Sequence, residues 1–232
     1  MSQVNKYPVD VTCTATLRPE LLSRTMRSFE DMVYTDGCTL QNFIINIDRT
    51  PVVAEELSII KQVINVLPHE LFQNVIISIP KKPSFAQAVK NVWSLTTSQF
   101  VFHLEDDWEI IKRIDLAAAC RMIYSDGYDY IRFPKLNADR LGCLDKIALQ
   151  PSLLLGDVVR ILSSYMSSRK DPEKQLRVQN SNSDILNKQI GMIKIADYSN
   201  DYYCRDIGRE WRDERGLKKW NKNNAGEITW QK

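Results

Sequence analysis

The stretch that decides the fold is Phe100-Val101-Phe102-His103-Leu104-Glu105-Asp106-Asp107-Trp108, where an apolar run ends in three adjacent carboxylates. An apolar and aromatic run of this length predicts a buried strand. Three carboxylates at its end repel one another unless a positive charge lies among them. Ligands of open α/β sheets bind beyond the carboxyl ends of the strands, and hard oxygen ligands suit Mg²⁺ or Mn²⁺. The alternative is a solvated acidic turn, but the buried approach and Trp108 favour a divalent-cation site.

The composition narrows the class of protein. The chain has 232 residues, which is within the range of one α/β unit, and its formal net charge of +2 argues against nucleic-acid binding by bulk electrostatics. The sequence shows neither a signal peptide nor a membrane span, so we expect a soluble, cytoplasmic protein without a membrane partner. The five cysteines form no CxxC pair, which favours reduced, packed thiols. The chain has only two histidines, His69 and His103, which are too few for a metal site made mainly of histidine ligands.

The N-terminal third predicts a strand followed by a helix. Val9 to Thr14 is apolar enough for a strand, and Pro19 is typical of the first position of a helix. The spacing of Leu21, Leu22, Thr25, Met26 and Phe29 predicts one buried face for that helix. The loop from Thr14 to Arg18 therefore joins a strand end to a helix start. Its backbone N–H groups and its arginine suit a nucleotide, although it lacks a glycine-rich phosphate cradle. An ordinary strand-to-helix turn explains the same residues.

A second strand, from Asn42 to Ile47, ends in Asp48, and Pro51 prevents further pairing. A carboxylate in that position can accept hydrogen bonds from a base or a ribose, or it can simply form a turn. Three more elements are predicted between Pro51 and the acidic stretch. The first is a helix over 53–67 with Leu57, Ile60, Ile64 and Leu67 on one face. A strand over 75–79 and a helix that begins at the capping box of Ser84 and Gln87 follow.

The second half is less regular. We predict a helix over 115–124, a strand over 128–133, a turn-rich stretch up to Cys143, a short strand over 147–149, a helix over 156–166, a helix start at Asp171-Pro172-Glu173, a strand over 192–196, and a short helix from about Ile207 that ends at Gly216. The order of elements implies an α/β fold whose mostly parallel central sheet is flanked by helices. We expect one domain over 1–232, with a nucleotide-binding half at 1–110 and an acceptor half with a tail at 111–232.

The ordered set TLRPELL, NID, SFAQAVKNVW and FVFHLEDDW resembles the small glycosyltransferases of the GT-A fold. Short phage and viral members are similar in their EDDW strand end, in a QPSL segment and in a tail like DIGREWRDERGLKKW. The resemblance covers most of the chain. It implies a single GT-A-like domain that transfers a sugar from a nucleotide-diphosphate sugar, with UDP-sugars favoured, in the presence of Mn²⁺ or Mg²⁺.

The resemblance also implies a set of site residues. Asp107 is the expected metal ligand, and Glu105 lies near the ribose or a metal-bound water. Many family members use a downstream histidine as a further ligand, and because none follows His103, Asp206 or water would take that place. The predicted donor-binding residues are Thr14, Arg18, Asp48, Glu105, Asp106 and Arg209.

An inverting transfer needs a carboxylate that accepts the proton of the attacking hydroxyl. Glu173 is the first candidate because it lies near a helix start in the second half and Pro172 fixes its backbone. The alternative is that Glu173 only complements the helix dipole. Asp171 and Asp184 are further candidates, and a retaining enzyme would need none of the three.

The basic tail has two explanations. Its arginines can neutralise a diphosphate or an acceptor phosphate, and its tryptophans can stack on a sugar or a base, or both can belong to a helix with one buried face. We favour the structural explanation for the tryptophans and a functional one for one or two arginines. These residues are Arg205, Arg209, Arg212, Arg215, Trp211, Trp220 and Trp230.

Four functions compete. The leading hypothesis is a metal-dependent glycosyltransferase whose acceptor is a 5-hydroxymethylated pyrimidine in phage DNA, which would place it in the host cytoplasm. A glycan or small-molecule acceptor is the near alternative, supported by the modest net charge. A nucleotidyltransferase can use the same fold and carboxylates, but the N-terminal region lacks a Gly-rich phosphate loop. A non-catalytic nucleotide- or sugar-binding module is the fourth.

Overall fold

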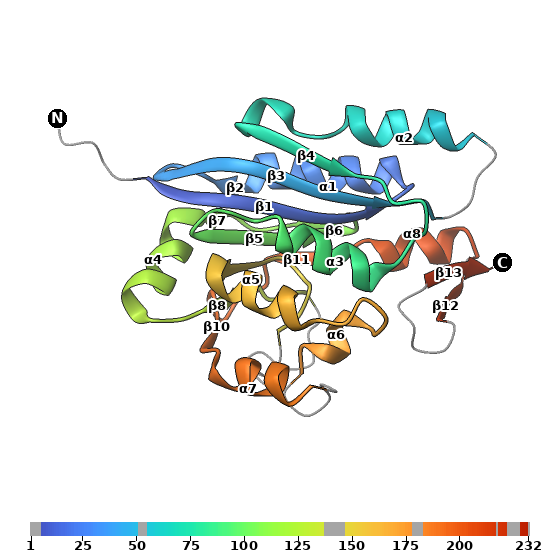
Figure 1. Ribbon diagram of the computed structural model, residues 1–232. Coiled ribbons are helices and arrows are strands. Elements are labelled where there is room, and N and C mark those ends of the chain that lie inside the picture. Colours follow the sequence, from blue (N-terminus) through green and yellow to red (C-terminus); the bar gives the residue numbers. More distant parts are fainter. Residues whose placement is uncertain are drawn as a thin grey trace.

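The computed structural model describes residues 6–50, 55–136, 147–177, 183–216, 218–221 and 228–231 (Figure 1). Its strands are β1 Tyr7–Thr16, β2 Val33–Tyr34, β3 Cys38–Asp48, β4 Asn74–Ser78, β5 Phe100–Glu105, β6 Trp108–Ile110, β7 Ile114–Asp115, β8 Tyr130–Arg132, β9 Ser152–Leu155, β10 Ile195–Asp197, β11 Cys204–Asp206, β12 Lys218–Asn221 and β13 Ile228–Gln231. Its helices are α1 Pro19–Met32, α2 Glu56–Asn65, the 3₁₀ turn His69–Leu71, α3 Phe85–Ser94, α4 Leu116–Asp126, α5 Gly156–Tyr165, α6 Pro172–Gln175, α7 Asp184–Met192 and α8 Gly208–Glu214.

A seven-stranded sheet in the order β10-β8-β9-β5-β1-β3-β4 forms the centre of the molecule. All neighbouring pairs are parallel except those of β9, which runs antiparallel to both β5 and β8. The predicted α/β class with a mostly parallel, helix-flanked sheet is therefore confirmed. There are also three two-stranded ladders, β11 with β6, β12 with β13 and β2 with β7.

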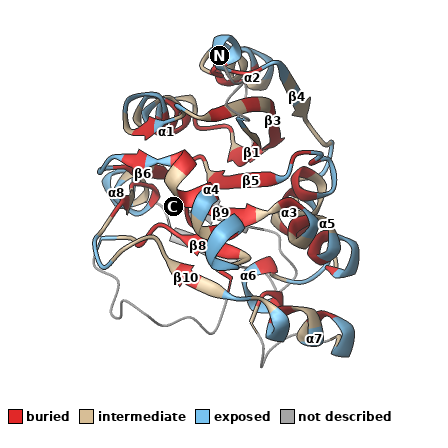
Figure 2. Ribbon diagram, turned by 90° about the vertical axis from the view of Figure 1, so that its left-hand side faces the viewer, coloured by how far each residue is buried: buried red, intermediate tan, exposed pale blue. Residues whose placement is uncertain are grey.

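Helices cover both faces of the sheet, and the two faces form two cores. Side chains of α1, α2 and α4 pack on one face together with Phe100, Phe102 and Leu104 of β5. On the other face, α3, α5 and α7 pack against Val101 of the same strand. Figure 2 shows the buried strands in red between helices whose outer surfaces are pale blue. Both faces of β5 are therefore buried, which explains why Phe100 to Leu104 are apolar apart from the buried His103.

The N-terminal elements agree with the predictions except at Leu57. The residues expected on the inner face of α1 are buried, and Ser84 caps α3 by accepting a hydrogen bond from the Gln87 backbone N–H. The predicted face of α2 is partly wrong, because Leu57 is 73% exposed while Val63 is fully buried. A stripe of Ile60, Val63 and Leu67 is equally compatible with helical spacing, and packing against the sheet selects it.

One predicted strand of the second half is absent and another is shifted. Ile147 and Leu149 are buried, but 147–149 is not a strand, because the Ile147 N–H donates to the Leu176 carbonyl instead of joining the sheet ladder. The last strand begins at Ile195, since α7 extends through Met192. The turn-rich stretch expected up to Cys143 lies largely outside the described residues. No helix in the described part of the chain is long and apolar enough to cross a membrane.

Candidate functional site

Three adjacent strands bring Thr14, Asp48 and Glu105, which are among the predicted site residues, to one edge of the sheet. The parallel ladders pair Thr16 of β1 with Asp48 of β3, and Thr14 of β1 with Glu105 of β5. The carboxyl ends of these strands therefore meet at the edge where α8 and the start of α3 also lie, on the right in Figure 1. We call this the carboxyl edge.

Asp106 is the inner residue of the acidic triplet. It is only 2% exposed. One carboxylate oxygen accepts hydrogen bonds from the backbone N–H and hydroxyl of Thr16, at 2.9 and 3.1 Å, and the other accepts from Arg18 Nη2 at 2.5 Å. Its carbonyl accepts a further bond from the Thr25 hydroxyl. All of these contacts are internal, so Asp106 holds the loop after β1 and the start of α1 onto the end of β5.

Arg18 supplies the positive charge that the triplet requires. Its guanidinium bonds Asp106 and also contacts Asp107 Oδ2 at 3.2 Å, although it is almost fully buried. Burial alone would lower the pKa of Arg18, but the two carboxylates and their hydrogen bonds raise it above its ordinary value. Arg18 therefore stays charged and neutralises part of the cluster.

Asp107, like Glu105 and unlike Asp106, is partly exposed. Its side chain is 20% exposed, and the bond from Arg18 is its single side-chain hydrogen bond with a described residue. Burial raises the pKa of Asp107, Arg18 opposes the shift, and the carboxylates of Asp106 and Asp206 add to it. A carboxylate with spare acceptor capacity and unrelieved repulsion is suited to a cation.

Asp206 is brought beside the triplet by the antiparallel ladder of β11 with β6, in which Asp206 pairs with Trp108. The Ile207 N–H donates to the Asp107 carbonyl, and Asp206 accepts from the backbone N–H groups of Gly208 and Arg209. A Cβ atom on Gly208 would lie 2.2 Å from Asp107 Oδ2. The start of α8 thus approaches the Asp107 carboxylate as closely as a glycine permits.

The donor chemistry at this edge fits a divalent cation. Mg²⁺ and related ions are commonly bound by one or two carboxylates and completed by phosphates and water. Among the described residues no group of three or more His, Cys, Asp or Glu side chains is placed to hold a metal ion by itself. Asp107 and Asp206 have the required oxygen donors, and Glu105, which accepts a bond from the Trp108 indole at 3.1 Å, lies two residues from Asp107.

Asp48 lies at the end of β3. It accepts hydrogen bonds from the Asn46 side chain at 2.9 Å and from the Ser84 N–H at 3.0 Å. Burial raises its pKa to about 6, despite these two bonds, which lower it. The structure thus links the end of β3 to the first turn of α3 through a carboxylate that is costly to ionise.

The tail packs onto the N-terminus of α1. Trp211 Nε1 donates to Glu20 Oε1 at 2.7 Å, and its ring lies 5.5 Å from Arg18 and 4.5 Å from Arg215. Arg205 forms an ion pair with Glu109. The remaining tail residues are less informative: Arg209 is exposed, Arg212 is half-buried, and the side chains of Trp220 and Trp230 lie outside what the structure describes.

The three candidate bases lie away from the triplet in sequence and in contacts. Asp171 caps α6 by accepting a bond from the Lys174 N–H at 3.3 Å, Glu173 is exposed in the first turn of α6, and Asp184 is exposed at the start of α7. No hydrogen bond or ion pair joins them to the acidic triplet in the part of the chain described. Their catalytic roles stay predictions, as do the donor-binding roles of Thr14, Arg18, Asp48, Asp106 and Arg209.

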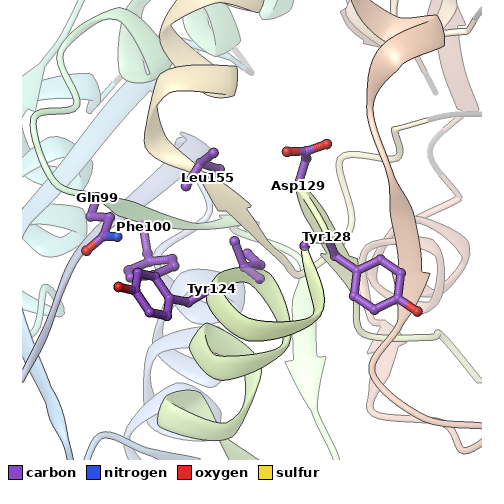
Figure 3. Close-up of a pocket in the computed structure, with 8 residues that line it drawn as sticks. Gln99, Phe100, Tyr124, Tyr128, Asp129 and Leu155 are labelled. Atoms are coloured by element: carbon purple, nitrogen blue, oxygen red, sulfur yellow. The ribbon is translucent and has the colours of Figure 1, made fainter.

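His103 and a small pocket lie away from the carboxyl edge. His103 is fully buried, its Nδ1 accepts a bond from the Trp93 indole, and burial lowers its pKa to about 3. A pocket of about 230 Å³ lies between β5, α4 and β9 (Figure 3). Phe100 and Leu155, which line it, pair at the opposite end of β5 from Glu105. The pocket is therefore at the amino edge of the sheet.

Comparisons with known proteins place this geometry in context. No protein-family model and no curated protein matches the sequence. Solved structures do match: the mannosyltransferase PcManGT from Pyrobaculum calidifontis, in complex with GDP-Man and Mn²⁺, has a TM-score of 0.61 at 13% identity over 90% of this chain and 61% of its own.

Two further structures have the same fold. TarS 1–349 of S. aureus, in complex with UDP-GlcNAc, has a TM-score of 0.56 at 12% identity over 85% of this chain and 58% of its own. HddC from Yersinia pseudotuberculosis has a TM-score of 0.53 at 14% identity over 89% of this chain and 97% of its own. The chain spans 36% of the length of another, longer structure of S. aureus TarS and 61% of the length of PcManGT. This chain therefore has the same α/β fold as a mannosyltransferase whose structure contains a nucleotide sugar. The resemblance seen in the sequence implied this fold.

Several residues of the site were not foreseen from the sequence. Thr16 contacts Asp106 twice, Ser84 holds Asp48, and Gly208 makes room for Asp107. Only Ser84 carried a usable signal, because its capping role already placed it at the start of a helix. The other two contacts join segments about ninety and one hundred residues apart, and nothing local in the sequence marks them.

Proposed function

We propose that this chain is a metal-dependent glycosyltransferase that moves a sugar from a nucleotide-diphosphate sugar to a hydroxyl acceptor. The observation that carries the proposal is the partly exposed Asp107, buttressed by Arg18 and Asp106 and flanked by Asp206, at the carboxyl edge of the sheet. The fold supports it, because the mannosyltransferase that shares it binds GDP-Man and Mn²⁺. UDP-sugars are the favoured donors, in line with the UDP-GlcNAc complex of TarS.

Each residue of the carboxyl edge has a proposed part. Asp107 would hold Mn²⁺ or Mg²⁺, with Asp206 and Glu105 as further oxygen donors. The bound ion would supply positive charge to the diphosphate leaving group. Arg18 keeps Asp107 in place and limits repulsion within the triplet. Asp48, fixed by Ser84, would accept hydrogen bonds from the base or ribose of the donor.

Glu173 is the proposed base. As the acceptor hydroxyl attacks the sugar, the Glu173 carboxylate would take its proton. Its helix lies near the start of α3, because the Ser84 hydroxyl contacts the Ser168 carbonyl at 3.5 Å, and Ser84 also holds Asp48. Asp171 already caps α6, which leaves less of its carboxylate for catalysis. An acceptor in hydroxymethylated phage DNA and one in a glycan or small molecule are both compatible with this arrangement.

A donor screen tests the proposal. Nucleotide-diphosphate sugars are added to the protein with and without Mn²⁺, and the melting temperature and slow nucleotide release are measured. One donor should raise the melting temperature in a metal-dependent way, because a ligand that binds only the folded state stabilises it. A shift without any nucleotide release would indicate a binding module. Release of pyrophosphate from a nucleoside triphosphate and a sugar 1-phosphate would indicate a nucleotidyltransferase instead.

The base is tested separately with Glu173→Gln. Loss of a general base should lower kcat by roughly two to four powers of ten and leave donor affinity nearly unchanged. If Glu173 serves only the helix dipole, turnover stays normal and the melting temperature falls slightly. Normal turnover would direct the same test to Asp171→Asn and Asp184→Asn. Normal turnover in all three variants would favour a retaining mechanism.

A further inference from the structure

Two segments far apart in sequence form one surface beside the carboxyl edge. The loop before α3 and the loop before α6 meet where Ser84 Oγ contacts the Ser168 carbonyl, and Lys90 Nζ donates to the Met166 carbonyl at 2.9 Å. The second loop is rigidly held from within. The buried Gln175 side chain accepts from the Ser167 N–H and donates to the carbonyls of Ser167 and Lys170, at 2.7 to 2.9 Å.

This surface presents a group of unpaired cations. Lys81 and Lys82 come from the first loop, and Arg169 and Lys170 from the second, and all four are exposed. We call them the basic ridge. None of the four forms a salt bridge with any residue that the structure describes. Elsewhere the chain pairs many of its arginines, including Arg49 with Glu56 and Arg132 with Asp197.

The basic ridge lies a few contacts from the acidic triplet. Ser84 lies where the two loops of the basic ridge meet, and its N–H donates to Asp48. Asp48 pairs with Thr16 in the sheet, and Thr16 donates to Asp106. Glu173, the proposed base, follows Arg169 by four residues. A cationic surface therefore adjoins the side from which the proposed acceptor would approach.

We infer that the basic ridge binds the phosphodiester backbone of a polymeric acceptor. The inference rests on the proposed function, since it names the acceptor class of the same site. Lysine and arginine side chains that neutralise backbone phosphates release condensed counterions, which gives affinity without base recognition. The formal charge of the whole chain is only +2, so any such binding must come from a local cluster and not from bulk charge.

Binding is tested with a fluorescent single-stranded DNA oligonucleotide at several salt concentrations. The wild-type chain is compared with the triple variant Lys81→Gln, Lys82→Gln, Lys170→Gln, and with the control Lys61→Gln, Lys188→Gln, Lys194→Gln. The control changes three exposed lysines on other parts of the molecule, so both variants lose the same net charge. We expect the ridge variant to bind roughly 10- to 100-fold more weakly and to lower the salt slope by about 2, whereas the control keeps near-wild-type binding.

Two further arms identify what is recognised. An oligonucleotide with uncharged methylphosphonate linkages should not bind, and if it binds as well as DNA the inference is overturned. An abasic phosphodiester oligomer that binds as tightly as DNA would assign the ridge to phosphodiester chains in general, and weaker binding would assign it to nucleic acid. Equal weakening in the ridge variant and the control, or no binding by the wild type, identifies the ridge as an ordinary solvated surface and overturns the inference.

The failure of this inference is distinguishable from failure of the proposed function. The donor-induced rise in melting temperature and slow nucleotide release are measured on the same variants. The ridge residues lie outside the proposed donor and metal contacts, so both readouts should match those of the wild type. A chain that binds the oligonucleotide through the ridge but shows no donor response would refute the glycosyltransferase proposal alone.

Discussion

Each of the two edges of the central sheet carries a carboxylate, Asp10 in the first half of β1 and Asp107 just after β5, but the two carboxylates differ in their hydrogen bonds. At the amino edge, Asp10 accepts five hydrogen bonds from the backbone and side chains of Asn42, Thr97 and Ser98. At the carboxyl edge, Asp107 accepts one side-chain bond from the described residues and is partly exposed. The first carboxylate has its acceptor capacity filled by the fold, and the second keeps capacity for something else.

This difference in free acceptor capacity, and not burial or pocket size, is the reason for proposing the site at the carboxyl edge. The pocket of about 230 Å³ lies at the amino edge, where Asp129 is its one acidic lining residue. The carboxyl edge gathers Asp48, Asp106, Asp107 and Asp206, with Arg18 among them. Proteins retain such incompletely satisfied groups where a ligand completes them, often at some cost in stability.

The largest effect is expected from Asp107→Asn. The change keeps the size of the side chain but removes a ligand charge, so turnover with Mn²⁺ should fall by roughly a thousandfold or more. The melting temperature should stay close to that of the wild type, because Arg18 keeps Asp106 as a partner. Nucleotide release and thermal unfolding are measured on one sample. Wild-type turnover in this variant would remove the carboxyl edge from the mechanism.

Asp10→Ala should show the opposite pattern. Five donors would lose a buried acceptor, so the free energy of unfolding should fall by about 3 kcal/mol or more. The folded fraction should keep its donor affinity, because Asp10 lies at the far edge. Denaturant unfolding and a donor titration check the two parts. A selective loss of donor affinity, with stability unchanged, would break the contrast between the edges.

Gly208→Ala probes how closely the tail approaches Asp107. A Cβ atom would meet Asp107 Oδ2 at 2.2 Å, so either the carboxylate or α8 must move. A displacement of this size should lower kcat by roughly 10- to 100-fold. Gly191→Ala is the matched control, because its added Cβ meets nothing within 4 Å. Equal activity of the two variants would show that the position of α8 does not matter to Asp107.

The sequence predicted the fold best where local periodicity decides it. The inner face of α1 is as expected, since its apolar spacing allows one orientation. The strand expected over 147–149 is absent, because tertiary hydrogen bonds replace the ladder there: Gln150 Nε2 donates to the Phe133 carbonyl, and Ile147 N–H to Leu176. An apolar run alone does not reveal which partner its backbone will find.

The sequence placed Asp48 and the acidic triplet each at the end of a strand. The parallel ladders bring those two strand ends to the same edge of the sheet, while the roles of the residues there stay predictions. Which carboxylates stay partly exposed could not be read from the sequence, because β5 ends at Glu105 and a turn then sets the directions of Asp106 and Asp107. The place of Arg18 at the nucleotide stays a prediction, and its contacts with carboxylates 88 and 89 residues away were not foreseen, because nothing local in the sequence marks them.

The smallest effect concerns the pH dependence of stability caused by Asp48. Burial raises its pKa from 3.8 to about 6 in the folded protein. Between these values the folded state retains a proton that the unfolded chain has released, so the contribution of Asp48 to stability falls as pH rises through this window. Below it both states are protonated and the penalty disappears, and above it the penalty is constant at roughly 3 kcal/mol.

Asp48→Asn should remove this penalty. The amide can still accept from the Ser84 N–H, and a rotated Asn46 side chain can accept from it. Denaturant unfolding from about pH 4 to about pH 8 should therefore show the variant gaining on the wild type as pH rises, while donor affinity falls because the acceptor carboxylate is lost. Only the difference between the two proteins is interpreted, since other carboxylates titrate in both. If the difference in unfolding free energy between the two proteins does not change with pH, the Asp48 carboxylate is as fully hydrogen-bonded as that of Asp10. If donor affinity is also unchanged, only the acidic triplet of this edge takes part in the proposed function.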